Sequence, residues 1–343
     1  MRPASVQTID YHTAGEPFRI VADLPIQLPG RTVAERRARA LQDPQAQWLR
    51  SLLCSEPRGH ADMYGGFIVP PDDEGADFGV LFWHKDGFST ACGHGTIALG
   101  AWAVEAGRVT RRISDPQDGP VEVVIDVPSG RVTARVHLEQ GRPAGVDFIN
   151  VPSWPIAEDI PVITSAGELT VEIGFGGAIY AMLPASRAGL VVEPQYLDRL
   201  ISLGREIKWA LNEHEVARHP TDDRLSGIYG TIWYDELGAS DSDVLHQRNV
   251  TIFADGEVDR SPCGSGTSAR LAMLASQGCL APGGLLRHDS IIGSTFIARI
   301  LGEVEVDGRI AVLPQVSGMA YRTGEHRFVV DPSDPLVPGF LLR

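Results

Sequence analysis

Two cysteines open the same short motif, once in each half of the chain. Residues Cys92–Ala98 and Cys263–Ala269 share the pattern C-G-x-G-T-x-A and lie almost half of the 343-residue length apart. Each motif follows a loop-like segment and leads into an apolar, helix-forming run. A matched heptapeptide at this period indicates an internal duplication, with one cysteine at the N-terminus of a helix in each half.

The N-terminus of a helix suits both thiol and carboxylate chemistry. Its unpaired backbone N–H groups carry a partial positive charge, which lowers the pKa of a cysteine, so we expect thiolate near neutral pH. The same N–H groups can bind a substrate carboxylate, and the glycines of the motif allow the backbone to approach it closely.

Two such thiols predict a specific reaction. If the halves pair about a pseudo-twofold axis, Cys92 and Cys263 face each other across one interdomain cleft. One thiolate then removes a proton from a carbon atom, and the opposite thiol delivers a proton to its other face. This acid/base pair inverts the configuration of the carbon without a cofactor, which is the chemistry of a racemase.

Composition excludes several other classes of partner. The chain has 30 Lys and Arg against 44 Asp and Glu, a net charge of −14, which disfavours nucleic acid and anionic membranes. No apolar stretch reaches the length of a membrane span, and residues 1–5 do not begin a secretory signal. Four cysteines are too few for a disulfide scaffold. We expect a cytoplasmic protein with a small-molecule substrate, and a homodimer as the working assembly.

Short strands with frequent turns dominate the pattern, and helices are fewer. Apolar runs predict strands near 66–70, 79–83, 121–125 and 302–306, and 37 glycines with 24 prolines suit the turns between them. Helical patterns cover 32–53, 95–106, 193–211 and 267–277. Two prolines within 150–155 mark the expected hinge. The fold class is α+β.

Two other interpretations of the motifs are weaker. Residues 93–98 and 264–269 also match the dinucleotide fingerprint G-x-G-x-x-A, but no clear βαβ unit surrounds either copy. Cys54 and Cys279 lie outside the repeat and are expected to be small buried hydrophobic residues.

A metal site is not predicted. His12, Glu16, His60 and Asp62 occupy glycine-containing loops, but no HExxH or CxxC spacing accompanies them, so structural or supporting roles are favoured. Asp259 precedes Cys263 by four residues; it either accepts a hydrogen bond from a substrate ammonium or makes a local turn. His94 either tunes the adjacent thiol or presents its backbone amide.

At these residues the chain resembles the proline racemase family, whose members act on proline and hydroxyprolines without a cofactor. The resemblance covers essentially the whole length. The segments that carry it are Asp10–Glu16, Glu56–Met63, Cys92–Gly95, Phe175–Ala178, Asp259–Ala269, Ile292–Ser294 and Asp331–Pro335.

The resemblance implies a diaminopimelate epimerase-like fold with two pseudo-symmetric halves, each a β-sheet wrapped around a central helix. The first half would comprise 1–150 with 322–343, and the second 151–321. It also implies the roles of site residues. Cys92 and Cys263 would be the acid/base pair, Gly93, His94, Gly264 and Ser265 would bind the carboxylate through amides, and Asp259 would lie near the substrate nitrogen.

Within the family, the residue at the second thiol position separates activities. Racemases and 4-hydroxyproline 2-epimerases resemble this chain in having cysteine at both positions, whereas typical trans-3-hydroxy-L-proline dehydratases have threonine at the second. Cys263 therefore favours a racemase or 2-epimerase of proline or 4-hydroxyproline. The segments 79–84, 177–181 and 225–232 look closer to the dehydratase branch, which is the first alternative.

Two rivals come from other classes. A cysteine hydrolase would use one thiolate as a nucleophile with helix-end amides as an oxyanion hole, and would leave the repeat unexplained. A non-catalytic amino-acid binding protein would bind proline analogues without exchanging protons.

Overall fold

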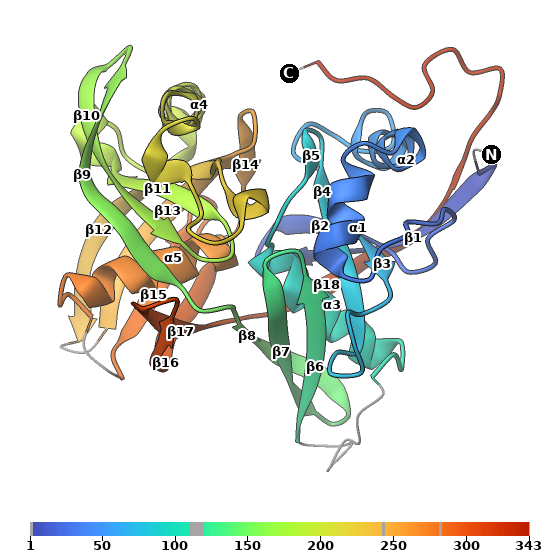
Figure 1. The fold of residues 1–343 in the computed structure, drawn as a ribbon, viewed down its shortest axis with the longest axis horizontal. Helices are drawn as coiled ribbons and strands as arrows, with labels where there is room; N and C mark the ends of the chain where they lie inside the picture. Colours follow the sequence, from blue (N-terminus) through green and yellow to red (C-terminus); the bar gives the residue numbers. More distant parts are fainter. Residues whose placement is uncertain (1–2, 110–118, 242–243, 281–282, 343) are drawn as a thin grey trace. The chain divides into compact units, whose positions relative to one another are not determined.

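The computed structural model describes residues 3–109, 119–241, 244–280 and 283–342. The chain divides into two compact units, Met1–Val146 with Met319–Arg343, and Asp147–Gly318 (Figure 1). Each unit has its own sheet and its own central helix.

The first unit is built on a sheet with the strand order β18-β1-β2-β3-β4-β6-β7. Neighbouring strands are antiparallel, except for the parallel pairs β2/β3 and β4/β6, and β5 forms a hairpin with β4. Its elements are β1 (Ser5–Thr13), β2 (Glu16–Val21), α1 (Val33–Ala40), α2 (Pro44–Cys54), β3 (Gly65–Val69), β4 (Phe78–His84), β5 (Gly87–Phe88), α3 (Gly93–Glu105), β6 (Pro120–Val127), β7 (Gly130–Glu139), β8 (Arg142–Ile149, which runs past the division) and β18 (Ala320–Val329).

The second unit has the strand order β9-β10-β11-β12-β13-β15-β16-β17. Here the parallel pairs are β11/β12 and β13/β15, and β14 forms a hairpin with β13. Its helices and strands are β9 (Trp154–Thr164), β10 (Gly167–Phe175), β11 (Ile179–Pro184), α4 (Leu197–Leu211), β12 (Ile228–Asp241), β13 (Val244–Phe253), β14 (Glu257–Asp259), α5 (Gly264–Ser276), β15 (Leu285–Ser290), β16 (Thr295–Val306) and β17 (Arg309–Gly318), together with short 3-10 turns.

The two sheets repeat one connectivity. The strands β1, β2, β3, β4, β6 and β7 of the first unit pair in the same order and directions as β10, β11, β12, β13, β15 and β16 of the second. In both units a short hairpin strand comes directly before the cysteine helix. The duplication that the motifs indicate therefore extends to the whole topology, and the predicted α+β fold with two pseudo-symmetric halves is confirmed.

The two cysteine helices are central in their units. All residues of α3 from Gly93 to Ala103 are buried, and the helix packs on β1, β2, β6, β7 and β18. All residues of α5 from Gly264 to Leu274 are buried, and it packs on β9, β10, β11, β16 and β17. A helix surrounded in this way has no solvent-facing side, so its polar residues bond to neighbouring strands, as Thr267 does with His288 and Arg270 with Glu172.

The helix predicted over 32–53 is wrong in one respect, because it is two helices. Thr32 caps α1 by accepting the Glu35 amide, and Asp43 caps α2 by accepting the Gln45 and Ala46 amides. Pro44 at the first turn of α2 has no N–H to continue the preceding helix and disfavours helical geometry at Asp43.

The other predicted helices are confirmed with shifted starts. The regular helix α4 begins at Leu197 rather than 193, after a 3-10 turn at Pro194–Tyr196, and α5 begins at Gly264 rather than 267.

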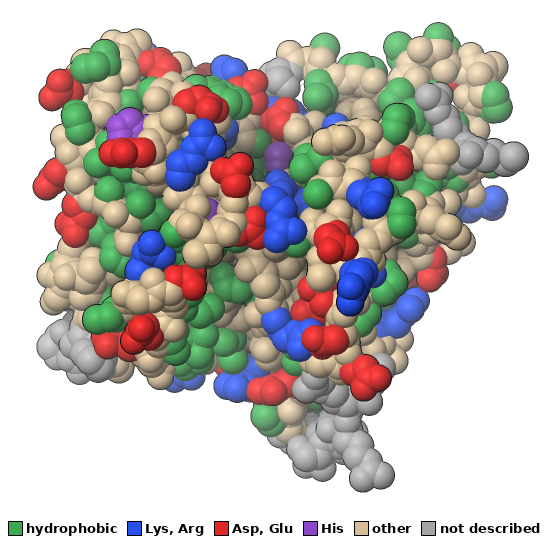
Figure 2. Space-filling view, viewed as in Figure 1, with side chains coloured by type: hydrophobic (Ala, Val, Ile, Leu, Met, Phe, Trp, Pro, Cys, Tyr) green, Lys and Arg blue, Asp and Glu red, His purple; other side chains and the backbone are tan. Residues whose placement is uncertain are grey.

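The surface shown in Figure 2 carries acidic and basic side chains side by side. On that face of the described residues, Lys and Arg do not gather into one continuous stripe. Within the described residues, no helix is both long enough and apolar enough to cross a membrane.

Close packing of α3 gives a test of the fold. A Cβ on Gly100 would lie 2.6 Å from the Ala134 Cβ and 3.3 Å from the Val136 Cγ2, both in β7. Gly100→Val should therefore lower the free energy of unfolding by about 1–3 kcal/mol, measured by urea denaturation. Gly145→Ala is the control, because a Cβ there meets no atom within 4 Å. Equal urea midpoints for the two variants would contradict this packing.

Candidate active site

Cys92 occupies the N-cap position of α3. Its backbone is extended (φ −157°, ψ 104°), and its Sγ accepts a hydrogen bond from the Gly95 amide at 3.2 Å. The Thr96 amide and hydroxyl both donate to the Cys92 carbonyl, at 3.0 and 2.8 Å. A Cβ on Gly95 would lie only 2.7 Å from the sulfur. The motif thus places the thiol against helix-end N–H groups, which favour negative charge on the sulfur.

His94 lies beside this thiol with its side chain. Both ring nitrogens are 3.5 Å from the Cys92 Sγ. The ring meets Tyr64 and Phe18 edge-on, with centroid distances of 5.0 and 5.9 Å, and the Thr13 hydroxyl donates to the His94 carbonyl at 2.8 Å. The imidazole is therefore held where it can influence the thiol, while the role of the His94 amide in binding substrate stays a prediction.

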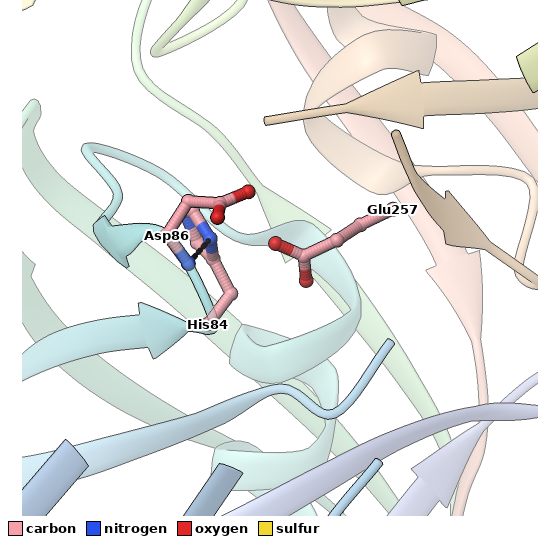
Figure 3. A group of neighbouring side chains, drawn as sticks. All are labelled: His84, Asp86 and Glu257. Atoms are coloured by element: carbon pink, nitrogen blue, oxygen red, sulfur yellow. Dashed lines mark hydrogen bonds between the residues drawn. The ribbon is translucent and has the colours of Figure 1, made fainter. Parts of the chain in front are cut away.

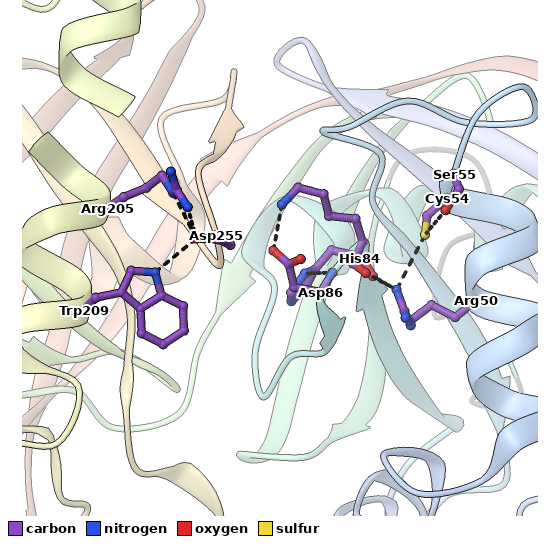
Figure 4. A network of polar contacts seen from close by, with 9 residues as sticks. Arg50, Cys54, Ser55, His84, Asp86, Arg205, Trp209 and Asp255 are labelled. Atoms are coloured by element: carbon purple, nitrogen blue, oxygen red, sulfur yellow. Dashed lines mark hydrogen bonds and ion pairs between the residues drawn. The ribbon is translucent and has the colours of Figure 1, made fainter. Parts of the chain in front are cut away.

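The turn between β4 and β5 supports this end of the first unit. The Asp86 amide donates to the His84 Nδ1 at 3.3 Å (Figure 3), and burial lowers the pKa of His84 to about 3, so its imidazole is neutral at pH 7. The Arg50 guanidinium of α2 donates to the His84 carbonyl at 2.7 Å (Figure 4). The His84 ring packs 5.6 Å from Tyr64, which packs on His94. No sequence motif marks this support, because Arg50 acts on backbone carbonyls.

Cys263 begins α5 in a strained conformation. Its φ of 61° and ψ of 98° place a non-glycine residue in the left-handed region, which costs about 1–3 kcal/mol. A chain of hydrogen bonds from the end of β14 holds it there. The Cys263 amide donates to the Ser261 Oγ at 3.1 Å, and the Ser261 amide and hydroxyl donate to the Asp259 Oδ1 at 2.8 and 2.7 Å.

Two further hydrogen bonds hold the same turn at the carbonyl of Pro262. It accepts hydrogen bonds from the Asn249 Nδ2 and the Thr267 Oγ1, both at 3.0 Å. The Thr267 hydroxyl also lies 2.8 Å from the Nδ1 of His288, a buried histidine whose pKa burial lowers to about 3. Hydrogen bonds to Ser261 and to the Pro262 carbonyl therefore both hold the strained backbone at Cys263.

The expectation of a thiolate at Cys263 is wrong for this environment. Burial raises the pKa of the Cys263 thiol well above its usual value, and the neighbouring Asp259 carboxylate raises it further. The Thr251 hydroxyl and the Gly266 amide lower the pKa, but by less than burial raises it. Proximity to a helix N-terminus is outweighed by loss of water, so Cys263 is a neutral thiol at pH 7.

Asp259 is itself perturbed. Burial raises its pKa to about 6, against the hydrogen bonds from Ser261, which lower it. The Asp259 Oδ1 accepts the Ser261 hydrogen bonds and so makes a local turn, which is one of the two roles predicted for Asp259 from the sequence. A contact with a substrate nitrogen stays a prediction.

Tyr180 of β11 is a neighbour of the second thiol that the sequence analysis does not single out. Its hydroxyl is 2.7 Å from the Ser265 Oγ and 3.9 Å from the Cys263 Sγ. Burial raises the pKa of Tyr180 well above its usual value, so the phenol stays protonated. The only signal in the sequence is a tyrosine within an otherwise apolar strand.

The predicted site residues therefore form two groups. Cys92, Gly93 and His94 lie together at the start of α3, and Asp259, Cys263, Gly264 and Ser265 lie together at the start of α5. Gly93 and Gly264 are the first residues of their helices, where amides have no intrahelical acceptor. This position suits the carboxylate binding that the sequence predicts for them.

The residues weighed for a metal have local structural contacts. The Gly15 amide donates to the His12 Nδ1 at 3.1 Å, and the Asp62 amide donates to the His60 Nδ1 at 3.2 Å. Outside the repeat, Cys54 is buried in the core as expected, whereas Cys279 is exposed, contrary to the expectation.

Comparison with known proteins decides the family. The sequence matches the proline racemase family over residues 8–341. The chain belongs to this family. It is 42% identical to a trans-3-hydroxy-L-proline dehydratase of Bacillus thuringiensis subsp. konkukian, over 98% of this chain and 97% of the relative. It is also 42% identical to a 3-hydroxyproline 2-epimerase of Burkholderia multivorans, over 99% and 98%.

Solved structures of similar proteins agree with this fold. A hydroxyproline epimerase from Agrobacterium vitis with bound trans-4-hydroxy-L-proline superimposes with a TM-score of 0.90 at 31% identity, covering 100% of this chain and 97% of that one. A PhzF-family phenazine biosynthesis protein from Bacillus anthracis shares the fold alone, with a TM-score of 0.55 at 11% identity over 95% and 99% of the two chains.

The Asp259 carboxylate gives a test of the thiol environment. Asp259→Asn removes a negative charge beside Cys263, so the thiol pKa should fall by about one unit. The measurement is the pH dependence of Cys263 alkylation, followed by mass spectrometry of its peptide. Asp255→Asn is the control, because Asp255 is a half-exposed carboxylate bound to Arg205 and Trp209 (Figure 4). An unchanged alkylation midpoint in Asp259→Asn would contradict the account.

The same carboxyl predicts a pH dependence of stability. Its pKa is about 6 in the folded protein against the usual 3.8, so between these values the folded state binds a proton that the unfolded state releases. The contribution of Asp259 to stability therefore falls as the pH rises through this window, by up to about 3 kcal/mol. Asp259→Asn should gain unfolding free energy relative to the parent between pH 4 and 7. A constant difference across that range would rule out a buried, perturbed carboxyl.

Proposed function

We propose that this proline racemase family enzyme acts on 3-hydroxyproline, and that its main reaction is dehydration of trans-3-hydroxy-L-proline to Δ1-pyrroline-2-carboxylate. The observation that carries the proposal is the difference between the two thiols. Both sulfurs are buried and contact a helix-end amide, but Cys92 lies beside the His94 imidazole, whereas Cys263 lies beside the buried Asp259 carboxylate, which raises the pKa of its thiol. The choice of 3-hydroxyproline is supported by the two relatives at 42% identity, which are both named for that substrate.

Cys92 is the proposed base. The Gly95 amide donates to its sulfur, and helix-end dipoles stabilise the thiolate that must remove the Cα proton. Amides of Gly93, His94, Gly264 and Ser265 are proposed to hold the substrate carboxylate. The carboxylate takes up the electron pair released at Cα, and amide donors aimed at it lower the barrier.

Stereochemistry lets one thiol perform the whole elimination. In trans-3-hydroxy-L-proline the Cα hydrogen and the 3-hydroxyl lie on the same face of the ring, because the hydroxyl is trans to the carboxylate. The Cys92 thiol formed by proton abstraction therefore stands beside the leaving group. It returns its proton to the departing hydroxide, water leaves, and the enamine product tautomerises to the imine.

The inequality of the thiols favours dehydration over reversible inversion. A racemase needs each thiol to serve in turn as base, because the two enantiomers present their Cα hydrogens to opposite faces. Cys263 is poorly suited to that role, since burial and the Asp259 charge both oppose its thiolate. As a neutral thiol it resembles the threonine that is typical of dehydratases at this position.

Inversion at Cα is the second candidate. A neutral Cys263 thiol on the opposite face could protonate the same intermediate and give cis-3-hydroxy-D-proline, as in a 2-epimerase. This candidate is favoured by the presence of a thiol at 263 and by the relative from Burkholderia multivorans. The two named activities are then two fates of one intermediate. Proline and 4-hydroxyproline, which the sequence alone favours, become the comparison substrates.

Proton NMR in D₂O tests the substrate and the reaction together. L-proline, trans-4-hydroxy-L-proline and trans-3-hydroxy-L-proline are incubated in separate tubes with the enzyme. We expect the 3-hydroxy compound to disappear into an imine, with slower or no change in the others. Suppose instead that the Cα proton of proline or 4-hydroxyproline exchanges and the 3-hydroxy compound does not react. The enzyme would then be a racemase or 2-epimerase of proline or 4-hydroxyproline, and the proposal would be wrong.

Single substitutions separate the two thiols. Cys92→Ser should lower dehydration by about 10²–10⁴-fold, because it removes the base. Cys263→Ser should keep dehydration within about tenfold but abolish the 2-epimer, because neither step of the elimination uses Cys263. The exposed Cys279→Ser is the control. If Cys263→Ser loses dehydration as fully as Cys92→Ser, the one-thiol elimination is excluded.

A further inference from the structure

The polar neighbours of the Cys263 sulfur include both hydrogen-bond donors and hydrogen-bond acceptors. The Thr251 hydroxyl and the Gly266 amide favour the thiolate, as hydrogen-bond donors do. The S–H group faces two acceptors, the Asp259 carboxylate and the Tyr180 hydroxyl, the latter at 3.9 Å. Asp259 is the group proposed to bind the substrate nitrogen. Once it does so, Tyr180 is the acceptor that remains for the thiol proton.

Tyr180 is oriented for that task by Ser265. The two hydroxyls are 2.7 Å apart, so a phenol that donates to the Ser265 Oγ turns its oxygen lone pairs toward the thiol. Tyr180 is fully buried, and its ring belongs to the same apolar cluster as Cys263 and Ile232. Packing therefore fixes the ring, and the hydroxyl is the part whose removal changes the polarity around the sulfur.

We propose that Tyr180 is a positioning residue that sets the partition between dehydration and inversion, by holding the Cys263 S–H away from Cα. The inference rests on the proposed function, because it concerns the two fates of the same intermediate. With the S–H donated to Tyr180, the intermediate expels hydroxide, which takes the proton from the Cys92 thiol. With the S–H released, the proton moves to Cα, the S–H bond breaks, the C–H bond forms, and the 2-epimer results without loss of water.

The test compares Tyr180→Phe with the parent enzyme acting on trans-3-hydroxy-L-proline in D₂O. The readout is the ratio of deuterated 2-epimer to imine, which does not depend on the amount of active enzyme. We expect the ratio to rise about two- to fivefold, which is the size of effect that a weak S–H hydrogen bond provides. If the parent gives no epimer, its appearance in the variant supports the proposal. An unchanged or lower ratio, or no epimer in either enzyme, overturns it.

Tyr234→Phe is the matched control. Tyr234 is another buried tyrosine of the same cluster, and its ring stacks under Arg270 with the cation 4.1 Å from the centroid. The substitution removes a phenol hydroxyl while keeping that ring, so the product ratio should match that of the parent. A ratio that rises equally in Tyr234→Phe would overturn the assignment to Tyr180.

A second measurement works without turnover. Because the Tyr180 hydroxyl lies 3.9 Å from the Cys263 sulfur, the midpoint of Cys263 alkylation should shift in Tyr180→Phe and stay unchanged in Tyr234→Phe. If the parent does not consume 3-hydroxyproline, the proposed function fails while this contact is still tested. If the parent is active but both the midpoint and the ratio stay unchanged, the role of Tyr180 alone fails.

Discussion

One helix in each unit is enclosed by strands along most of its length, and this burial fixes the position of its cysteine. From Gly93 to Ala103 and from Gly264 to Leu274 every residue is buried, so neither helix can shift without disrupting the strands around it. The N-terminus of each helix, with its unpaired N–H groups, is consequently fixed in place. The glycines of the repeated motif follow from the same constraint, since a Cβ on Gly95 or Gly266 would lie 3.0 Å or less from the sulfur of its cysteine.

The duplication places a cysteine at the N-terminus of a buried helix in each unit. The neighbouring side chains make the two cysteines chemically different. Cys92 has an extended backbone and accepts an amide at its sulfur, beside an imidazole. Cys263 sits at a positive φ, beside a buried carboxyl that reinforces its neutral form and a buried phenol whose hydroxyl lies 3.9 Å from its sulfur. Equal thiols would serve a reaction that runs equally in both directions. Unequal thiols suit a reaction in which one group takes the proton and the other does not.

The sequence predicts the features of the structure that come from a repeated motif or from hydrophobic periodicity. The C-G-x-G-T-x-A motif gives the duplication, the helix starts and the two cysteines, and the four strands predicted from hydrophobic runs overlap β3, β4, β6 and β16. Hydrophobic spacing does not reveal the break at Pro44, because apolar residues continue through it into α2. The neutral state of Cys263 could not be predicted, because it results from burial by segments distant in the chain and from Asp259. Arg50 and Tyr180 leave no motif, since one holds a backbone carbonyl and the other lies in an apolar strand.

If only Cys92 acts efficiently as the base, a substrate whose Cα hydrogen lies on the opposite face must lose it slowly. The initial rate of Cα–H loss in D₂O is measured with trans-3-hydroxy-L-proline and with its 2-epimer, cis-3-hydroxy-D-proline, at equal concentrations. Removal of the proton from the second compound requires Cys263 as the base, so the account predicts a much slower rate. Equal rates for the two compounds would contradict it, because both thiols would then be competent bases.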